Sequence, residues 1–262
     1  KMDLAGIISC AGVFSDFFGF MYGSFFGFED VLKAIWLKPM NQMMDVPLVG
    51  RLNAVFVIAI GFGMSIILIC MVFNIINSIR RGDTEKTWFD SNAVAGLVFY
   101  GSIVLTIGLF ISGKKLPAAA ILVIMFGVPL LLMFLKEPLT NLVEKKSEIL
   151  PEQKGMFFVQ SFFELFEVLL SYLSNTLSFL RIGAFAVSHA AMMEVVLMLA
   201  GATNGGSPNW IVIVLGNIFV CAMEGLIVGI QVLRLEYYEI FSRFYAGNGR
   251  EFKPFMKAAH KN

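Results

Sequence analysis

Ionisable and polar side chains interrupt two long apolar stretches toward the end of the chain. Along the first stretch, Phe157–Ala200, they recur mostly three or four positions apart and therefore fall on one face of a helix. They are Glu164, Glu167, Ser171, Asn175, Ser178, Arg181, Ser188 and His189. The second stretch, Trp210–Phe244, carries Asn217, Glu224 and Gln231 at intervals of seven, followed by Arg234, Glu236 and Glu239. A charge at the centre of a membrane helix costs about 2.5–3.5 kcal/mol, so each is expected to face a bundle interior or a water-filled path.

Two interpretations of these side chains remain open: they pair with one another and lock the two helices together, or they line a route for ions. Aligning the outer ends of the stretches at Leu199 and Trp210 gives each residue a depth. Counted in residues from those ends, the depths are 10 for His189, 14 for Glu224, 18 for Arg181, 24 for Arg234, 29 for Glu239, 32 for Glu167 and 35 for Glu164. The second interpretation therefore predicts an outer polar set, a central arginine layer and an inner acidic set.

These sets form a hypothesis of two cation half-channels separated by fixed positive charge, which would stop a cation from running straight through. The ion-path arginines are Arg181 and Arg234. The outer half-channel is assigned to His189, Glu224, Ser188 and Gln231, and the cytoplasmic half-channel to Glu164, Glu167, Asn175, Ser178 and Glu239. No catalytic residue, metal site or cofactor is predicted, because the three cysteines form no CxxC or Cys/His cluster and no GxxxxGK[ST] loop for ATP is present.

The composition excludes an ordinary water-soluble globule. Of the 262 residues, 58% are hydrophobic and 15% are charged, against about 25% charged in a typical soluble domain. The mean hydropathy is +0.78. A formal net charge of +1 argues against a nucleic-acid partner, which requires a basic face. We therefore expect an all-α, multi-pass integral membrane protein in contact with the lipid bilayer.

Six segments are long and apolar enough to span a bilayer, at about 20 residues each. They are Leu4–Phe28, Leu52–Ile79, Ala93–Ile111, Leu116–Leu135, Phe157–Ala200 and Trp210–Phe244. As single helices the last two would be about 66 and 52 Å long against a hydrocarbon core of about 30 Å, so we expect them to tilt strongly or to protrude. Placing both termini in the cytoplasm puts thirteen Lys and Arg residues on that side and five outside, which the positive-inside rule favours.

The polar motifs resemble one family. The stretch Leu173–Met193 is similar to the penultimate helix of the large membrane subunit of V-type and archaeal-type rotary ATPases, called subunit a or subunit I. Met223–Glu239 and Phe244–Phe255 resemble its last helix and tail, and Gly19–Gly27 resembles its third span. The resemblance implies that Arg181 and Arg234 match paired arginines facing a rotor ring. It also implies that His189 and Glu224 line the non-cytoplasmic half-channel and that Glu239 matches an acidic position after the second arginine.

Members of that family have eight spans after a large cytoplasmic domain, so we expect a missing front that holds two helices and the stator-binding domain. Residues 1–156 are interpreted as a four-helix part with a cytoplasmic interfacial loop, and residues 157–262 as an ion-path hairpin with a cytoplasmic tail. The family implies a stator subunit that couples rotation to H⁺ or Na⁺ translocation, with a proteolipid rotor ring and the peripheral and central stalk subunits as partners. A prokaryotic cell membrane is the expected location. The alternative is a self-contained cation transporter or channel, which would predict inverted repeats, and none is found.

Overall fold

The chain is mostly helical in a computed structural model that describes residues 2–23, 28, 35–36, 43–46, 50–82, 84–114, 117–143, 154–202, 207–245 and 247. Its helices are α1 (Met2–Tyr22), α2 (Ala54–Arg81), α3 (Thr84–Trp88), α4 (Val94–Ile111), α5 (Ala119–Phe134), α6 (Lys136–Val143), α7 (Lys154–Ser178), α8 (Leu180–Leu199), α9 (Trp210–Leu235), the π-helix η2 (Glu236–Phe241) and α10 (Ser242–Phe244). The predicted tail motif beyond Tyr245, apart from Gly247, and residues 24–27 of the third-span motif lie outside the described residues.

Five helical segments of the described chain are long and apolar enough to cross a membrane, and six if the bent pair α5–α6 counts as one span. The expected class, a helical membrane protein, is thereby confirmed. α5 and α6 meet at an angle of 73°. The apolar run ends at this bend, where the charged residues Lys136 and Glu137 begin α6. A short antiparallel hairpin, β1 (Met43–Val46) with β2 (Gly50–Asn53), precedes α2 and is not foreseen by the sequence analysis.

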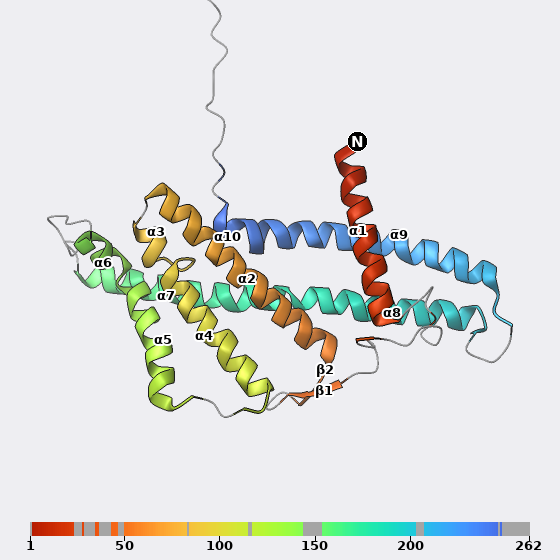
Figure 1. Ribbon diagram of the computed structural model, residues 1–262, viewed down its shortest axis with the longest axis horizontal. Helices are drawn as coiled ribbons and strands as arrows, with labels where there is room; N and C mark the ends of the chain where they lie inside the picture. Colours follow the sequence, from red (N-terminus) through yellow and green to blue (C-terminus); the bar gives the residue numbers. More distant parts are fainter. Residues whose placement is uncertain are drawn as a thin grey trace, which may run out of the picture.

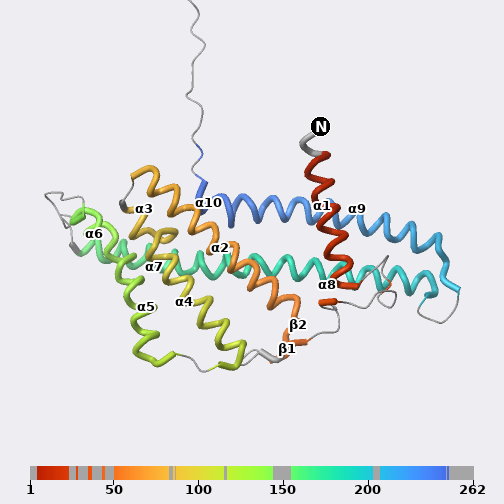
Figure 2. Tube along the Cα trace, viewed as in Figure 1, coloured from red at the N-terminus to blue at the C-terminus, as the bar shows by residue number. Residues whose placement is uncertain are grey.

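The two long helical rods lie side by side along the longest axis of the molecule; α2 crosses both at a large angle, and α4 and α5 run away from the first rod on the side opposite the second (Figure 1). α7 and α8 form one rod, and α9, η2 and α10 form the other, running back beside it (Figure 2). The turn between the rods is closed by a hydrogen bond from the Asn209 amide to the Ala200 carbonyl, 2.9 Å long. The side chain of Asn209 also caps α9 by accepting from the Ile211 amide. This geometry supports aligning the two rods at their outer ends.

The main core forms where α2 crosses α4 and the first rod. Ile67, Met71, Tyr100 and Phe179 are its largest fully buried side chains. Gly63 of α2 lets this crossing be close, because a Cβ at that position would overlap the Phe179 ring. By contrast, α1 contributes little to the core, since none of its spanning window is buried.

The first long helix forms one 45-residue spanning segment, Gly155–Leu199, close to the predicted Phe157–Ala200, with a local irregularity inside it. Phe179 separates α7 from α8, and its amide bonds to the carbonyl of Thr176, three residues back, rather than four. The Thr176 hydroxyl also donates to the Tyr172 carbonyl, a pattern that bends helices. The Phe179 ring at this point is fully buried and packs against Gly63 of α2. The irregular backbone bond therefore coincides with a long-range contact of the same residue.

Candidate functional site

The outer halves of the two rods are joined by a hydrogen bond between side chains. His189 of α8 and Glu224 of α9 meet with Nδ1 and Oε2 2.6 Å apart. The Glu224 side chain is 17% exposed and that of His189 is 47% exposed. Two residues matched in depth from the sequence are thus in direct contact. The pair fits the helix-locking interpretation as well as an ion path, because one side of it still opens to the surface.

The other two residues assigned to the outer half-channel are not part of this pair. Ser188 lines an otherwise apolar groove between α8 and α9, together with residues such as Met192 and Phe219. Gln231 is half-buried on α9, below Glu224. The outer part of the hairpin is therefore mostly apolar, with one polar pair set into it.

Neither arginine of the predicted central layer has a partner among the residues that the structure describes. Arg181 is half-buried, and its Nη1 atom is buried without a hydrogen-bond partner there. Arg234 is exposed on α9, in the last turn before η2. Both charges therefore lie in apolar rods without a neutralising group from the described part of the chain.

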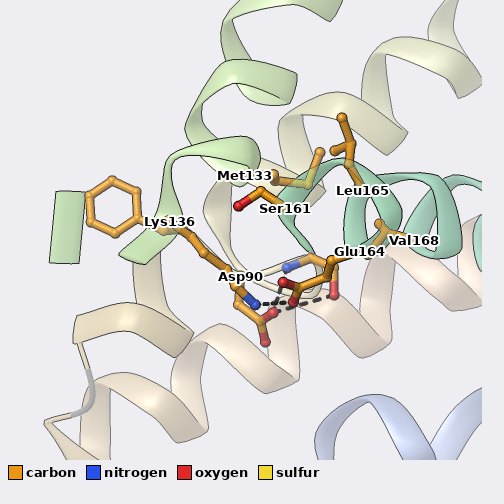
Figure 3. A pocket seen from close by; sticks show the side chains of 9 residues that line it. Asp90, Met133, Lys136, Ser161, Glu164, Leu165 and Val168 are labelled. Atoms are coloured by element: carbon orange, nitrogen blue, oxygen red, sulfur yellow. Dashed lines mark hydrogen bonds and ion pairs between the residues drawn. The ribbon is translucent and has the colours of Figure 1, made fainter. Parts of the chain in front are cut away.

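The inner acidic residues Glu164 and Glu167 differ in the contacts of their carboxylates. Glu164 forms an ion pair with Lys136, which stands at the bend between α5 and α6. Figure 3 shows the two side chains pointing at each other beside Asp90, at a cavity of about 20 Å³, enough for one water molecule. Glu167, one turn further along α7, is exposed. The Glu164 side chain is 41% exposed as well, so the two carboxylates differ in pairing: Glu164 has Lys136, whereas Glu167 has no ion-pair partner among the described residues.

The two remaining polar residues of α7 bond within their own helix. The Asn175 amide donates to the Ser171 hydroxyl over 3.2 Å, and the Ser178 hydroxyl donates to the Ser174 carbonyl over 3.1 Å. Both are half-buried, so they keep a polar surface on the helix without tying it to a neighbour. Among the described residues, no group of three or more His, Cys, Asp and Glu side chains could hold a metal ion.

Glu239 belongs to a buried polar cluster that sequence reasoning did not find. Its side chain is 5% exposed, and Oε2 has no hydrogen-bond partner in the described structure. Four residues later, Arg243 is also buried and donates through Nη1 to Oδ1 of Asn92, 2.9 Å away. In the sequence-based topology, Arg243 is among the thirteen basic residues placed on the cytoplasmic side. Only its position inside the apolar stretch, which ends at Phe244, could have signalled burial, because Asn92 lies 151 residues away.

Comparisons with known proteins agree on one family. Residues 140–257 match the model of the V-type ATPase 116kDa subunit family. The A-type ATP synthase subunit I of Pyrococcus horikoshii is 25% identical over 265 residues, which cover 96% of this chain and 36% of that protein. That of Saccharolobus solfataricus is 42% identical over 100 residues, 35% of this chain and 14% of that protein. The human V-type proton ATPase 116 kDa subunit a 3 is 31% identical over 129 residues, 44% of this chain and 15% of that protein. The chain thus spans about a third of the length of the Pyrococcus relative.

Proposed function

The chain belongs to the V-type ATPase 116kDa subunit family, and on that premise we propose that it supplies the stator side of the ion path in a rotary ATPase. In this proposal α7–α8 and α9–α10 face a proteolipid rotor ring. They provide two cation half-channels and an arginine barrier between them. Peripheral and central stalk subunits of the complex are the further partners. The transported ion is H⁺ or Na⁺, and this chain hydrolyses no ATP.

The observation that carries the proposal is the pair of arginines, Arg181 and Arg234, for which the described part of the chain supplies no partner. Glu164 forms an ion pair with Lys136, and the Glu224 carboxylate is in hydrogen-bond contact with His189. Arg181 and Arg234 are not neutralised by any described residue, although both lie in helices that are apolar enough to span a membrane. A charge in such surroundings is costly unless it finds a counter-charge or water. A carboxylate on a separate, moving subunit would supply that counter-charge.

The mechanism then follows from electrostatics. A rotor carboxylate that carries H⁺ or bound Na⁺ is neutral and can pass through lipid. When it faces a guanidinium, the ionised carboxylate is favoured by the nearby opposite charge, so the cation is released. Arginine suits this task because it stays charged and presents a rigid fork of donors. An ion that leaked past the barrier would dissipate about 2.3 kcal/mol per 100 mV of membrane potential.

Access to the barrier comes from its two sides. On the outer side, the His189–Glu224 pair is the charged group that attracts and relays the cation, and Ser188 and Gln231 lie beside this route. On the inner side, Glu167 and Glu239 are carboxylates without an ion-pair partner among the described residues, and Asn175 and Ser178 continue the polar face. We place both termini in the cytoplasm of a prokaryotic cell, because thirteen of the basic residues then lie on that side.

The test is substitution of each arginine in the assembled complex. Arg181→Ala and Arg234→Ala should each leave the subunit incorporated but abolish ATP-coupled ion uptake into vesicles. Arg181→Lys should also impair it, because an ammonium lacks the planar fork. The matched control is Arg80→Ala, which removes an exposed arginine at the end of α2 and should leave uptake unchanged. Normal coupled uptake with Arg181→Ala would overturn the proposal.

A further inference from the structure

One buried cluster is not used by the arginine barrier. It centres on Arg243, which is 6% exposed at the inner end of the second rod. Its guanidinium donates to Oδ1 of Asn92 and lies 5.8 Å from the centre of the Tyr172 ring. That distance is within the range of a cation–π contact. Arg243 thus contacts the loop before α4 and a side chain of α7 at once.

The loop before α4 anchors several helices at this point. The Tyr172 hydroxyl of α7 donates to the Ser91 carbonyl, and the Asn74 amide of α2 donates to the Asn92 carbonyl over 2.9 Å. The loop is pressed close to α4 as well, since a Cβ on Gly96 would overlap the Ser91 carbonyl oxygen. Arg243 joins the end of the second rod to a loop that is already fixed to α2, α4 and α7.

The π-helix explains why Arg243 reaches this loop. Four residues of an α-helix turn through 400°, so residues at i, i+4 and i+8 drift around the axis. A π-helix has more residues per turn, which offsets that drift. Leu235, Glu239 and Arg243 are spaced in this way across η2, and all three are buried. The wide turn therefore puts the Glu239 carboxylate and the Arg243 guanidinium on the same inward face.

We propose that Arg243 is a positioning residue for the inner half of the ion path: held by Asn92 and Tyr172, it fixes the end of the second rod and thereby the Glu239 carboxylate. The inference rests on the proposed function, in which Glu239 is an inner ion-path carboxylate. Arginine suits this role because its planar group donates to Asn92 through Nη1 while Cζ lies over the Tyr172 ring, within cation–π range. A lysine supplies the charge but cannot make both contacts in the same way.

The test asks whether a different tether can replace the arginine. Asn77 of α2 donates to the Phe244 carbonyl over 3.4 Å, so paired Asn77→Cys and Phe244→Cys can be tested as a disulfide that holds the same helix end, with closure of the bond first verified in the protein that retains Arg243. The experiment uses the whole complex, with Cys10, Cys70 and Cys221 replaced by serine or alanine. Arg243→Ala should lower coupled ion uptake about tenfold or more while the subunit stays incorporated, because small misplacements of a working group are costly. Oxidation of the cysteine pair should restore most of that uptake, and reduction should remove it again.

Two results would overturn the inference: full uptake with Arg243→Ala, or no recovery after the disulfide has formed. If Arg243→Ala prevents assembly, Asn92→Ala removes the same bond from the loop side. It should then give the same partial loss and the same rescue. Arg181→Ala distinguishes the two proposals, because the proposed barrier predicts no uptake from it whether or not the disulfide is closed. Uptake with Arg181→Ala would reject the barrier, whereas failed rescue of Arg243→Ala would reject only the positioning role.

Discussion

Charged side chains of the long hairpin divide into those with a partner inside the chain and those without one. Glu224 is paired with His189 and Glu164 with Lys136, whereas Arg181 and Arg234 have no counter-charge among the described residues. The two paired contacts link helices within this chain, α7 with the α5–α6 bend and α8 with α9. The charges of Arg181 and Arg234 remain energetically unfavourable in an apolar environment unless a counter-charge or water contacts them. This division favours an external partner for the arginines over a purely structural role.

Glu224→Gln tests the outer pair at this scale. The amide keeps the size of the side chain and can still bond His189, so incorporation of the subunit should change little. Loss of the negative charge should slow coupled ion uptake about tenfold, because a charged cleft raises the local cation concentration. Uptake and the amount of incorporated subunit are both measured in vesicles, with Glu194→Gln as the control, since Glu194 is an exposed carboxylate on the same helix as His189. A parallel loss of assembly and uptake would mean that the pair only locks the helices.

Among the helices, α2 has the contacts that hold the long hairpin in place. Gly63 admits the Phe179 ring, and Gly183 of α8 admits Phe56, where a Cβ would come within 2.9 Å of the ring. The break between α7 and α8 falls at the residue that fills the first of these contacts. Packing against α2 therefore sets how closely the first rod approaches the rest of the bundle.

Gly63→Ala and Gly61→Ala should have effects of opposite sign. The methyl group at Gly63 would overlap Phe179, and such overpacking costs about 1–3 kcal/mol. At Gly61, half a turn away, no described atom lies within 4 Å of the added group, so the better helix propensity of alanine should stabilise by up to about 1 kcal/mol. Thermal unfolding of the purified subunit measures both changes. Equal shifts for the two variants would contradict the close α2–Phe179 contact.

For the molecule as a whole, the important feature is that α2, α4 and α5 are strongly inclined to the two rods (Figure 1). The first rod includes a 45-residue apolar segment and the second a 35-residue one, both longer than an upright span requires. If α2 and α4 stand across the bilayer, the rods must lean strongly within it. Their polar residues would then be distributed from one membrane surface to the other.

Cysteine labelling from each side tests this arrangement. His189→Cys and Glu224→Cys should react with a polar thiol reagent added outside, and Glu167→Cys should react with the reagent added from the cytoplasm, because each set is predicted to line water on its own side. Leu226→Cys is the control, since this exposed apolar residue of α9 should face lipid and stay unreactive. Labelling of both sets from one side would contradict two half-channels.

The sequence alone determined the membrane class, the span positions within a few residues and the helices that carry the polar residues. These features follow from local hydropathy and helical spacing, which are properties of neighbouring residues. Counting along two helices from a shared turn also brought His189 and Glu224 to similar depth, because a hairpin fixes that relation. The resemblance of Leu173–Met193 and Met223–Glu239 to one family added the roles of Arg181 and Arg234.

Only the tertiary structure decided which of these charges find partners. Lys136 lies 28 residues from Glu164, and Asn92 lies 151 residues from Arg243, so neither contact leaves a trace in local spacing. The sequence also did not predict the irregularity at Phe179 or the π-helix at Glu236–Phe241. Each coincides with side chains that are buried against distant parts of the chain, such as Phe179 against Gly63 and Arg243 against Asn92. Periodicity predicts where a side chain points along its own helix. What it meets there depends on how the helices cross, and that is set by long-range packing.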